Sequence, residues 1–374
     1  MNSDNSKTTN FTDKGNIPKN NLSFMAIKNS SSISQDVKEY YSKKENILSF
    51  LNSTPFFEKL DLLEYISGGS SGCVYRGMFK GKNKRNVAVK FFINKKSKNE
   101  KKEKEIKIHE INISRKLHHK NVIETLGYYQ SPDINYSILE LGKYGDIEFF
   151  LRNLLKKYYL SETILNYFLF QLLESLQYIH KNKIVHMDIK PGNILINSNL
   201  DAKIADFSIS CLLSNLQQND IVKFPRVGTG RFMSPEILSQ AFIKIKDCDK
   251  IDLYSLGVTL YYLFYADFPY KLKGIRGKDY EGFLKNIKNE ELIFPEERNI
   301  SCYFKDFLKK ILEKDLTKRI NIHQAMNHPW VQGAKILFDE KENISCQESF
   351  MIRLITDNVP KFNEYVNLKI KNQI

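Results

Sequence analysis

Residues 184 to 196 read Ile-Val-His-Met-Asp-Ile-Lys-Pro-Gly-Asn-Ile-Leu-Ile, a polar loop between two short apolar runs. The runs at 184–185 and 194–196 are rich in β-branched residues, so we predict two short buried strands there. The polar side chains between them are His186, Asp188, Lys190 and Asn193. A carboxylate, an ammonium and an amide are costly to bury without partners or a ligand. The stretch therefore predicts either a binding loop or a polar turn that closes a hairpin.

Three further motifs surround this loop in a fixed order. A glycine-rich turn at 67–74 comes first, Val87-Ala88-Val89-Lys90 follows it, and Asp206-Phe207-Ser208 comes after the loop. A glycine-rich turn alone would be weak evidence. The ordered set, which covers the chain from about residue 60 to Trp330, resembles the signature of eukaryotic-type protein kinases. Within that family, Thr229 together with Lys190 is similar to the serine/threonine kinases.

The resemblance implies an α+β, bilobal protein-kinase fold with a small β-rich N-lobe, one key helix in it, and a larger, mainly helical C-lobe. It places the kinase domain at 56–331, with the N-lobe at 56–141 and the C-lobe at 142–331. Residues 1–55 are rich in Asn, Ser and Lys, so we expect a disordered, low-complexity extension there. Residues 332–374 form a C-terminal tail that either docks on the domain as a helix or binds a partner.

The glycine-rich turn is a candidate phosphate-binding loop. It reads Ser67-Gly68-Gly69-Ser70-Ser71-Gly72-Cys73-Val74. Glycines allow backbone amides to approach phosphate oxygens closely. In the resemblance, residues 67–72 bind the nucleotide, Ser67 stands at the position of the first glycine, and Val74 covers the adenine. An ordinary hairpin turn is the alternative.

Lys90 ends an apolar strand, and a lysine that points inward needs an anion. A helix is predicted at about 100–117. One face of it carries Ile106, Glu110, Ile113 and Leu117 at spacings of four, three and four. Glu110 is thus a carboxylate on an apolar face, or it lies at the edge of that face in solvent. The resemblance independently pairs Glu110 with Lys90. Ser114 replaces an apolar residue usual in the family, which predicts looser packing.

A strand predicted at 136–141 leads into Gly142-Lys143-Tyr144-Gly145-Asp146. In the resemblance, Leu139 guards the back of the nucleotide pocket. The adenine site comprises Ala88, Glu140 and Gly142, the last two through their backbone, and Leu195 as its floor. Asp146 meets the ribose, and as an alternative it caps the helix predicted at 147–156. Both roles are compatible.

The resemblance also gives the catalytic roles. A kinase positions two reactants and neutralises charge. Asp188 orients the substrate hydroxyl and accepts its proton, while Lys190 steadies the transferring phosphate. Asn193 and Asp206 hold Mg²⁺, a hard cation that prefers oxygen ligands. The implied cofactors are ATP and Mg²⁺.

Two structural contacts follow from the same resemblance. Glu236 is expected to pair with Arg319, and Asp252 is expected to brace the catalytic loop.

The chain departs from the family at three places. Met187 stands where an arginine often receives the phosphate of the activation segment, residues 206–236, so we expect activity without phosphorylation there. Ser208 replaces a glycine, which predicts a stiffer segment. Gly192 replaces a glutamate of basic-directed kinases, so a preference for Arg-rich substrates is not expected.

The composition of the chain limits the classes of binding partner that we expect. The 374 residues carry a net charge of +14, but the lysines at 95–104 mix with glutamates, and no nucleic-acid-binding motif stands out, so we expect no nucleic acid partner. The five cysteines contain no CxxC pair, which argues against zinc or a disulfide framework. An apolar run at 253–270 is interrupted by polar residues and predicts a buried helix, not a membrane span. A monomer in the cytoplasm is expected, with the nucleus as the alternative location.

These features predict an ATP-dependent serine/threonine protein kinase acting on protein substrates. The alternative is a pseudokinase that serves as a nucleotide-binding scaffold, supported by Ser67, Ser114, Met187 and Ser208. None of those four replaces a charge that phosphoryl transfer needs.

Overall fold

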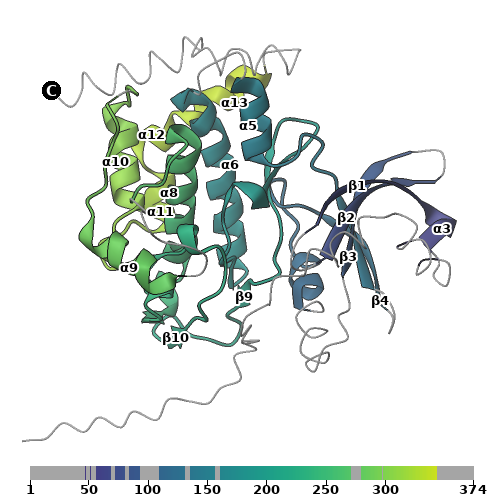
Figure 1. Ribbon diagram of the computed structural model, residues 1–374, viewed down its shortest axis with the longest axis horizontal. Helices are drawn as coiled ribbons and strands as arrows, with labels where there is room; N and C mark the ends of the chain where they lie inside the picture. The colour runs from purple at the N-terminus through teal and green to yellow at the C-terminus, as the bar shows by residue number, and fades with distance from the viewer. Residues whose placement is uncertain are drawn as a thin grey trace, which may run out of the picture.

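The computed structural model describes most of the chain between residues 56 and 342. The described residues are 47, 51, 56–68, 72–80, 84–92, 109–130, 135–155, 161–270, 279–296 and 298–342. Gly69, Ser70 and Ser71 of the predicted phosphate loop lie outside them, as do 343–374 and all but two residues of the N-terminal extension. In Figure 1 a small lobe built on a sheet stands beside a larger lobe of helices, which confirms the α+β, bilobal arrangement.

The small lobe is a five-stranded antiparallel sheet in the order β1-β2-β3-β5-β4. The strands are β1 (Leu60–Gly68), β2 (Gly72–Phe79), β3 (Asn86–Phe92), β4 (Thr125–Gln130) and β5 (Asn135–Glu140), preceded by helix α3 (Phe56–Lys59). β3 is rich in Val and Phe, which favour strands, and is buried from its second residue onward. Tyr75, Phe91 and Tyr136 form an edge-to-face and tilted ring series in the lobe's core. The sheet thus holds β3, and Lys90 on it, at its centre.

The large lobe is mainly helical. Its helices are α5 (Ile147–Leu155), α6 (Glu162–Lys181), α7 (Pro235–Leu238), α8 (Asp249–Tyr265), α9 (Tyr280–Asn289), α10 (Cys302–Ile311), α11 (Ile322–Met326), α12 (Pro329–Gln332) and α13 (Ala334–Glu342). The hydroxyl of Ser161 caps α6 by accepting a hydrogen bond from the N–H of Ile164. α8 contains most of the apolar run at 253–270 and is buried on nearly every side, as a helix that is apolar all round requires. Within the described ranges, no helix is both long and apolar enough to cross a membrane.

Short strands and turns connect the helices around the site. They are β6 (Ile184–Val185), β7 (Ile194–Ile196), β8 (Ala202–Ile204), β9 (Cys211–Leu212), β10 (Ile221–Lys223) and β11 (Phe242–Lys244), with 3₁₀ turns η1 (Pro191–Asn193), η2 (Gly230–Phe232) and η3 (Ile245–Asp247). The two strands predicted at 184–185 and 194–196 are therefore present. They do not pair with each other, because β6 pairs with β9 and β7 pairs with β8. The hairpin alternative is wrong, and the polar loop between β6 and β7 is free to line a site.

The activation segment is joined to the chain that follows α7 by a short ladder. β10 pairs antiparallel with β11, and the central pair is Val222 and Ile243. Both side chains are buried in the core of the large lobe. Backbone hydrogen bonds from Ile245 to Asp220 and from Lys246 to Gln218 continue the ladder beyond the strands. The middle of the activation segment is thus held by its own backbone.

One ion pair lies deep in the large lobe. The Arg319 guanidinium donates to the two Glu236 carboxylate oxygens at 2.7 and 3.1 Å, as the sequence predicted for these two residues. Arg319 also donates to the carbonyls of Glu313 and Lys250, and it lies over the ring of Tyr254. This pair connects α7 at the end of the activation segment to the loop before α11.

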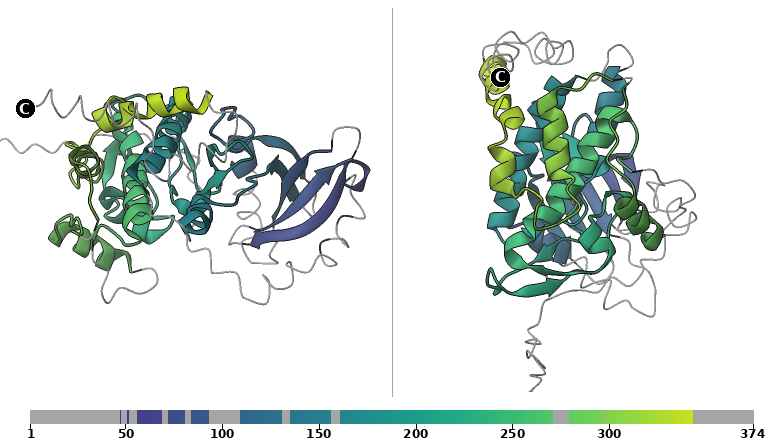
Figure 2. Two further views of the ribbon diagram at one scale, coloured as in Figure 1. Left: turned by 90° about the horizontal axis from the view of Figure 1, so that it is seen from above. Right: turned by 90° about the vertical axis from the view of Figure 1, so that its left-hand side faces the viewer.

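The described part of the C-terminal region continues past the expected end of the domain. α13 packs against α6, and Figure 2 shows it, in yellow, beside that helix. The Lys341 ammonium reaches the Tyr167 hydroxyl and an Asp201 carboxylate oxygen, both at 2.8 Å, and the Asn199 carbonyl at 3.1 Å. The ring of Phe338 lies 5.0 Å from that of Tyr167. Residues 334–342 therefore form part of the packed large lobe.

Candidate active site

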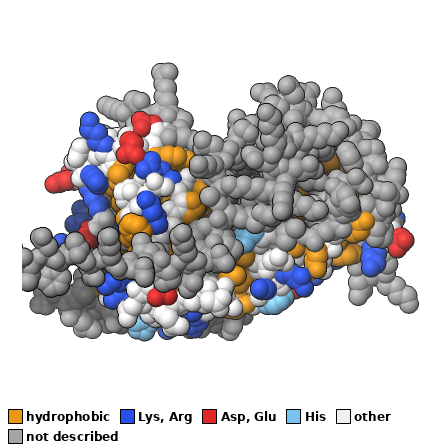
Figure 3. Space-filling view, turned by 90° about the horizontal axis from the view of Figure 1, so that it is seen from below, with side chains coloured by type: hydrophobic (Ala, Val, Ile, Leu, Met, Phe, Trp, Pro, Cys, Tyr) orange, Lys and Arg blue, Asp and Glu red, His pale blue; other side chains and the backbone are white. Residues whose placement is uncertain are grey.

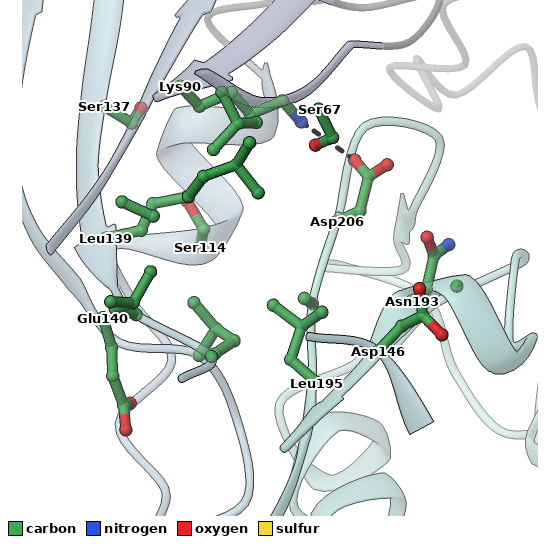
Figure 4. Close-up of a pocket in the computed structure, with 18 of the residues that line it drawn as sticks. Ser67, Lys90, Ser114, Ser137, Leu139, Glu140, Asp146, Asn193, Leu195 and Asp206 are labelled. Carbon is green, nitrogen blue, oxygen red and sulfur yellow. Dashed lines mark hydrogen bonds and ion pairs between the residues drawn. The ribbon is translucent and has the colours of Figure 1, made fainter. Parts of the chain in front are cut away.

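A cavity of about 600 Å³ lies between the lobes and gathers most of the predicted site residues. Those that line it are Ser67, Gly68, Gly72, Val74, Ala88, Lys90, Glu110, Glu140, Gly142, Asp146, Asn193, Leu195 and Asp206. Figure 4 shows Lys90 and Asp206 joined on one side of the cavity, with Leu139 and Leu195 on its walls. Asp188 and Lys190 do not line the cavity itself but lie in the same loop as Asn193. Residues from segments more than 100 positions apart thus meet at one place.

Lys90 forms one of the contacts between the lobes. Its ammonium lies 2.5 Å from the Glu110 carboxylate and 3.1 Å from that of Asp206. Glu110 lies on the helical residues 109–114, the described part of the predicted helix. Burial of Lys90 favours its neutral form, but the carboxylates of Asp206 and Glu110 outweigh this and raise its pKa. Lys90 is therefore a cation held by two anions, one from each lobe.

The surroundings of Asp206 favour its ionised form, and its backbone adopts an uncommon conformation. Burial alone would raise its pKa, but the Lys90 ammonium and a hydrogen bond from Ser208 lower it to about 2. Its φ is +66°, in the left-handed region. Ser208 is not among the residues with positive φ, so the serine carries no such strain in this conformation. The replacement of glycine at this position adds a hydrogen bond to the Asp206 carboxylate instead.

The catalytic loop converges on Asp188. Its Oδ2 accepts hydrogen bonds from Lys190 at 2.6 Å and from the Asn193 amide at 3.0 Å. Its Oδ1 accepts from the N–H and the hydroxyl of Thr229, at 3.0 and 2.9 Å. Lys190 in turn donates to the Thr229 hydroxyl at 2.7 Å. The carboxylate is thereby fixed in orientation by the loop that carries it and by the end of the activation segment.

Asp252 of α8 holds the backbone of this loop from below. Its carboxylate accepts hydrogen bonds from the N–H groups of His186 and Met187, at 2.8 and 2.9 Å. His180 lies 2.8 Å from the same carboxylate. Burial favours the neutral acid, but the histidine contacts and these hydrogen bonds lower the pKa of Asp252. The predicted bracing contact is present, and it supports Met187 at a φ of +72°.

The segment that joins the lobes, residues 140–146, uses some of its backbone groups in hydrogen bonds within the protein. The Glu140 N–H donates to the Glu124 carbonyl, and the Gly142 carbonyl accepts from Gly145. The sequence predicted adenine contacts for the backbone of Glu140 and Gly142, and both residues line the cavity. A side chain at position 142 would come within 2.8 Å of Leu195, so glycine brings the backbone close to the cavity floor. Asp146 accepts from the N–H of Phe149 and caps α5 while also lining the cavity.

Sequence reasoning missed a buried ion pair behind this segment. The Lys203 ammonium lies 2.6 Å from the Glu140 carboxylate, and Figure 4 shows the Glu140 side chain pointing away from the cavity. Lys203 sits in the apolar run of β8, so its position resembled that of Lys90 and could have prompted a search for an anion. The hydroxyls of Ser114, Thr125 and Ser137 at the back of the cavity were also unforeseen as a group. Ser114 is buried and donates to the Ile111 carbonyl.

Comparisons with known proteins agree with this geometry. A family model described as "Protein kinase domain" matches residues 60–331. A calcium/calmodulin-dependent protein kinase kinase of Caenorhabditis elegans is 33% identical over 238 residues, which cover 63% of this chain and 42% of that protein. The serine/threonine-protein kinase TIO of Arabidopsis thaliana is 31% identical over 286 residues, 76% of this chain and 20% of that protein.

A third relative is the probable serine/threonine-protein kinase fhkB of Dictyostelium discoideum. It is 32% identical over 314 residues, 81% of this chain and 26% of that protein. The shared length is less than half of each of these three relatives. The family match at residues 60–331 includes every residue that lines the cavity.

Proposed function

This chain belongs to the protein kinase superfamily, and we propose that it is an active serine/threonine kinase that transfers the γ-phosphoryl group of ATP to protein hydroxyls. One observation carries the proposal. The same structure contains two complete sets of contacts. In one, Lys90 binds Glu110 and Asp206. In the other, Asp188 accepts hydrogen bonds from Lys190, Asn193 and Thr229. Catalysis in this family consists mainly of positioning and charge neutralisation, so both sets of contacts are needed together.

The residues of the cavity fit ATP and Mg²⁺. The side-chain nitrogen of Asn193 donates hydrogen bonds to Asp188. Its side-chain oxygen is therefore the atom that would bind the metal, beside the Asp206 carboxylate. Oxygen ligands of this kind suit Mg²⁺, which completes its coordination with phosphate oxygens and water. When bound, the metal–nucleotide complex supplies the transferable phosphoryl group and neutralises part of its charge. A side chain at Gly72 would meet the Phe91 carbonyl, so glycine keeps the strand next to the phosphate loop close to β3.

The remaining residues act on the protein substrate. Asp188, held by four hydrogen bonds, orients the acceptor hydroxyl and takes its proton. Lys190, which already lies between Asp188 and Thr229, places a positive charge where the phosphoryl group crosses. Lys90 holds the phosphates of the nucleotide from the opposite side of the cavity. Each of these roles uses a group that is already oriented before substrate arrives.

We further propose that activity does not require phosphorylation of the activation segment. Met187 is buried among apolar side chains and offers no cation to a phosphate. Asp252 fixes the loop backbone at Met187 by itself. The ladder of β10 with β11 holds the middle of the segment, and the hydroxyl of Ser210 is buried and donates to the His186 carbonyl. These contacts perform the ordering that a phosphate would otherwise supply.

Phosphate incorporation into a generic basic protein and, in parallel, into a generic acidic protein tests the activity. We expect transfer from ATP by the wild-type protein and a loss of about 10³-fold or more in Asp188→Asn, which keeps the shape of the side chain. Asp279→Asn is the matched control, because Asp279 caps α9 away from the cavity. Equal, background-level incorporation by all three proteins, with nucleotide binding retained, would establish the pseudokinase alternative.

Phosphatase treatment tests the second proposal. Activity should be unchanged after treatment and in Ser214→Ala, whereas Ser208→Ala and Ser210→Ala should fall only as far as the loss of one hydrogen bond explains. Ser214 is exposed and is the accessible candidate among them. A loss of activity that an acidic residue at Ser210 or Ser214 restores would refute phosphorylation independence. Thr229→Ala is expected to lose activity because its hydroxyl contacts both Asp188 and Lys190, so that variant does not decide the question.

A further inference from the structure

Arg231 presents an unpaired positive charge beside the acceptor side of the site. It lies on η2, two residues after Thr229, and it is exposed. Its guanidinium lies 5.1 Å from the centre of the Phe268 ring, and among the described residues it forms no ion pair. Stacking on a ring holds the guanidinium plane in place while leaving its N–H groups free. A fixed, unpaired guanidinium is suited to bind an anion bidentately.

The ring under Arg231 is itself held by packing. Phe268 contacts the rings of Phe232 and Tyr262, at centroid distances of 5.5 and 5.0 Å. Phe232 is buried in the same turn as Arg231. Gly230 fits closely against α9, because a side chain there would come within 2.8 Å of the Phe283 ring. The direction of the Arg231 backbone is therefore set by η2, and its side chain is supported by Phe268, three residues after the end of α8.

The nearby carboxylates are already committed. Glu148 accepts hydrogen bonds from Arg152 and from the Tyr262 hydroxyl, at 2.5 and 2.8 Å. Glu281 is paired with Arg226 at 2.8 Å. These partners neutralise part of the carboxylate charge and so weaken its attraction for a basic substrate side chain.

Two further carboxylates stand near by and are engaged with the backbone. Asp279 caps α9, and Asp267 accepts a hydrogen bond from the N–H of Phe268. On the catalytic loop itself, Gly192 offers no side chain, and the space where one would lie is open. Figure 3 shows basic and acidic side chains interspersed over the described part of the face seen from below. Of the three arginines in this region, Arg152, Arg226 and Arg231, only Arg231 has no carboxylate partner among the described residues.

The distance from Arg231 to the reacting hydroxyl suits a neighbouring residue of a peptide. Thr229 contacts Asp188 directly, and two residues of chain span at most about 7 Å. An arginine side chain adds about as much again, while an extended peptide advances about 3.3 Å per residue. The guanidinium therefore lies within reach of about four substrate positions on one side of the acceptor.

We propose that Arg231 selects protein substrates that carry an anionic side chain, Asp, Glu or a phosphorylated residue, within about four positions of the acceptor serine or threonine. This inference rests on the proposed kinase activity, which it refines by naming the substrate class. Arg231 contacts the substrate chain and not the reacting atoms, so it determines specificity.

A peptide library with one fixed acceptor and Asp, phosphoserine, Ala or Arg at each of the four positions on either side tests the proposal. Wild-type protein should prefer an anionic residue at one position or more by about fivefold in kcat/KM over alanine. Arg231→Ala should remove the preference, and Arg231→Glu should reverse it in favour of arginine. A stronger response to phosphoserine than to Asp would identify a phosphorylated substrate, and an equal response would identify an acidic one.

Lys223 provides the matched control. It lies in the same segment and stacks on the Phe242 ring at 5.6 Å, but on the ladder of β10 and β11. Lys223→Glu should keep the wild-type preference, since it removes the same charge in the same way at a distance from Thr229. An anionic preference that Lys223→Glu changes as much as Arg231→Glu does would overturn the assignment to Arg231.

A binding measurement separates this inference from the proposed activity. Fluorescence anisotropy of a labelled Asp-rich acceptor peptide with wild-type, Arg231→Glu and Lys223→Glu proteins needs no phosphoryl transfer. We expect the wild-type and Lys223→Glu proteins to bind the peptide with an affinity that falls as salt is added, and Arg231→Glu to bind it more weakly even at low salt. Activity without any anionic preference would overturn the inference and leave the kinase proposal standing. Selective peptide binding without activity would do the reverse, and equal binding by all three proteins would overturn the inference in either case.

Discussion

Two buried ion pairs in the described part of the chain, one centred on Lys90 and one on Arg319, are built differently. Arg319 donates to both oxygens of Glu236, and its other N–H groups meet two carbonyls. Lys90 is a single ammonium between two carboxylates, and all three groups line the cavity. The Arg319 pair lies away from the cavity, and its hydrogen-bonding groups all have partners. The Lys90 pair lies beside the cavity and can bind a further charged ligand. We infer that the first serves stability and the second serves binding.

The largest effect is expected for Arg319→Met. The change leaves Glu236 buried without its partner in a part of the lobe that water does not reach, so the free energy of unfolding should fall by about 3–5 kcal/mol. Urea unfolding followed by circular dichroism measures it. The double variant Glu236→Met with Arg319→Met should recover part of the loss, because no unpaired charge remains. If the single and double variants lose the same stability, the pair is not what stabilises this region.

For Lys90→Met we expect a large loss of activity and a small loss of stability. We expect a fall of about 10²–10³-fold in kcat, because one preorganised charge is removed from the transition state. Stability should fall by only about 1 kcal/mol, since water in the cavity solvates the remaining carboxylates. Kinetics and urea unfolding on the same preparation give both values. Lys203→Met is the control for removing a buried lysine outside the cavity. A loss of stability as large as that of Arg319→Met would erase the distinction between the two pairs.

The acid dependence of stability should carry a contribution from the cavity pair. The pKa of Asp206 is about 2 in the folded protein, below its ordinary value of 3.8, so its ionised form stabilises the fold. That stabilisation is complete above pH 4–5 and is lost as the pH falls from about 4 towards 2. The unfolding midpoint in urea should therefore fall less steeply over this range in Asp206→Asn than in the wild-type protein. Asp267→Asn, at an exposed position, should follow the wild-type curve.

The smallest effect is expected for Ser208→Gly. The change removes one hydrogen bond to Asp206 and should alter kcat/KM by less than about fivefold. Glycine also widens the conformations open to the segment, so amide hydrogens at 207–212 should exchange faster. Hydrogen-exchange mass spectrometry measures this. Exchange that is slower in Ser208→Gly would show that the serine does not stiffen the segment.

Local patterns predicted the cavity pair better than the deep one. Glu110, Ile113 and Leu117 share a face by helical spacing alone, and the structure buries all three. Glu236 and Arg319 are 83 residues apart, so no periodicity connects them, and only the likeness to kinases indicated their pairing. The roles assigned to site residues remain predictions, although the cavity brings most of them together.

Other features could not be predicted because they depend on which segments become neighbours. The short strands at 184–185 and 194–196 were located correctly from their β-branched residues. Their partners were not, because two or three apolar residues can pair with any exposed edge. The contact of Lys203 with Glu140 likewise joins a strand of the large lobe to the last residue of β5. Sequence showed a lysine in an apolar run but not which carboxylate would face it.

The position of α13 has a practical consequence for anyone producing the catalytic region by itself. The protein kinase domain match ends at residue 331. A protein truncated at that point would lose the contacts of Lys341 with Tyr167 and Asp201. It would also expose to water the aromatic surface of α6 that Phe338 covers. Such a fragment should express with poorer solubility than one that ends after Glu342.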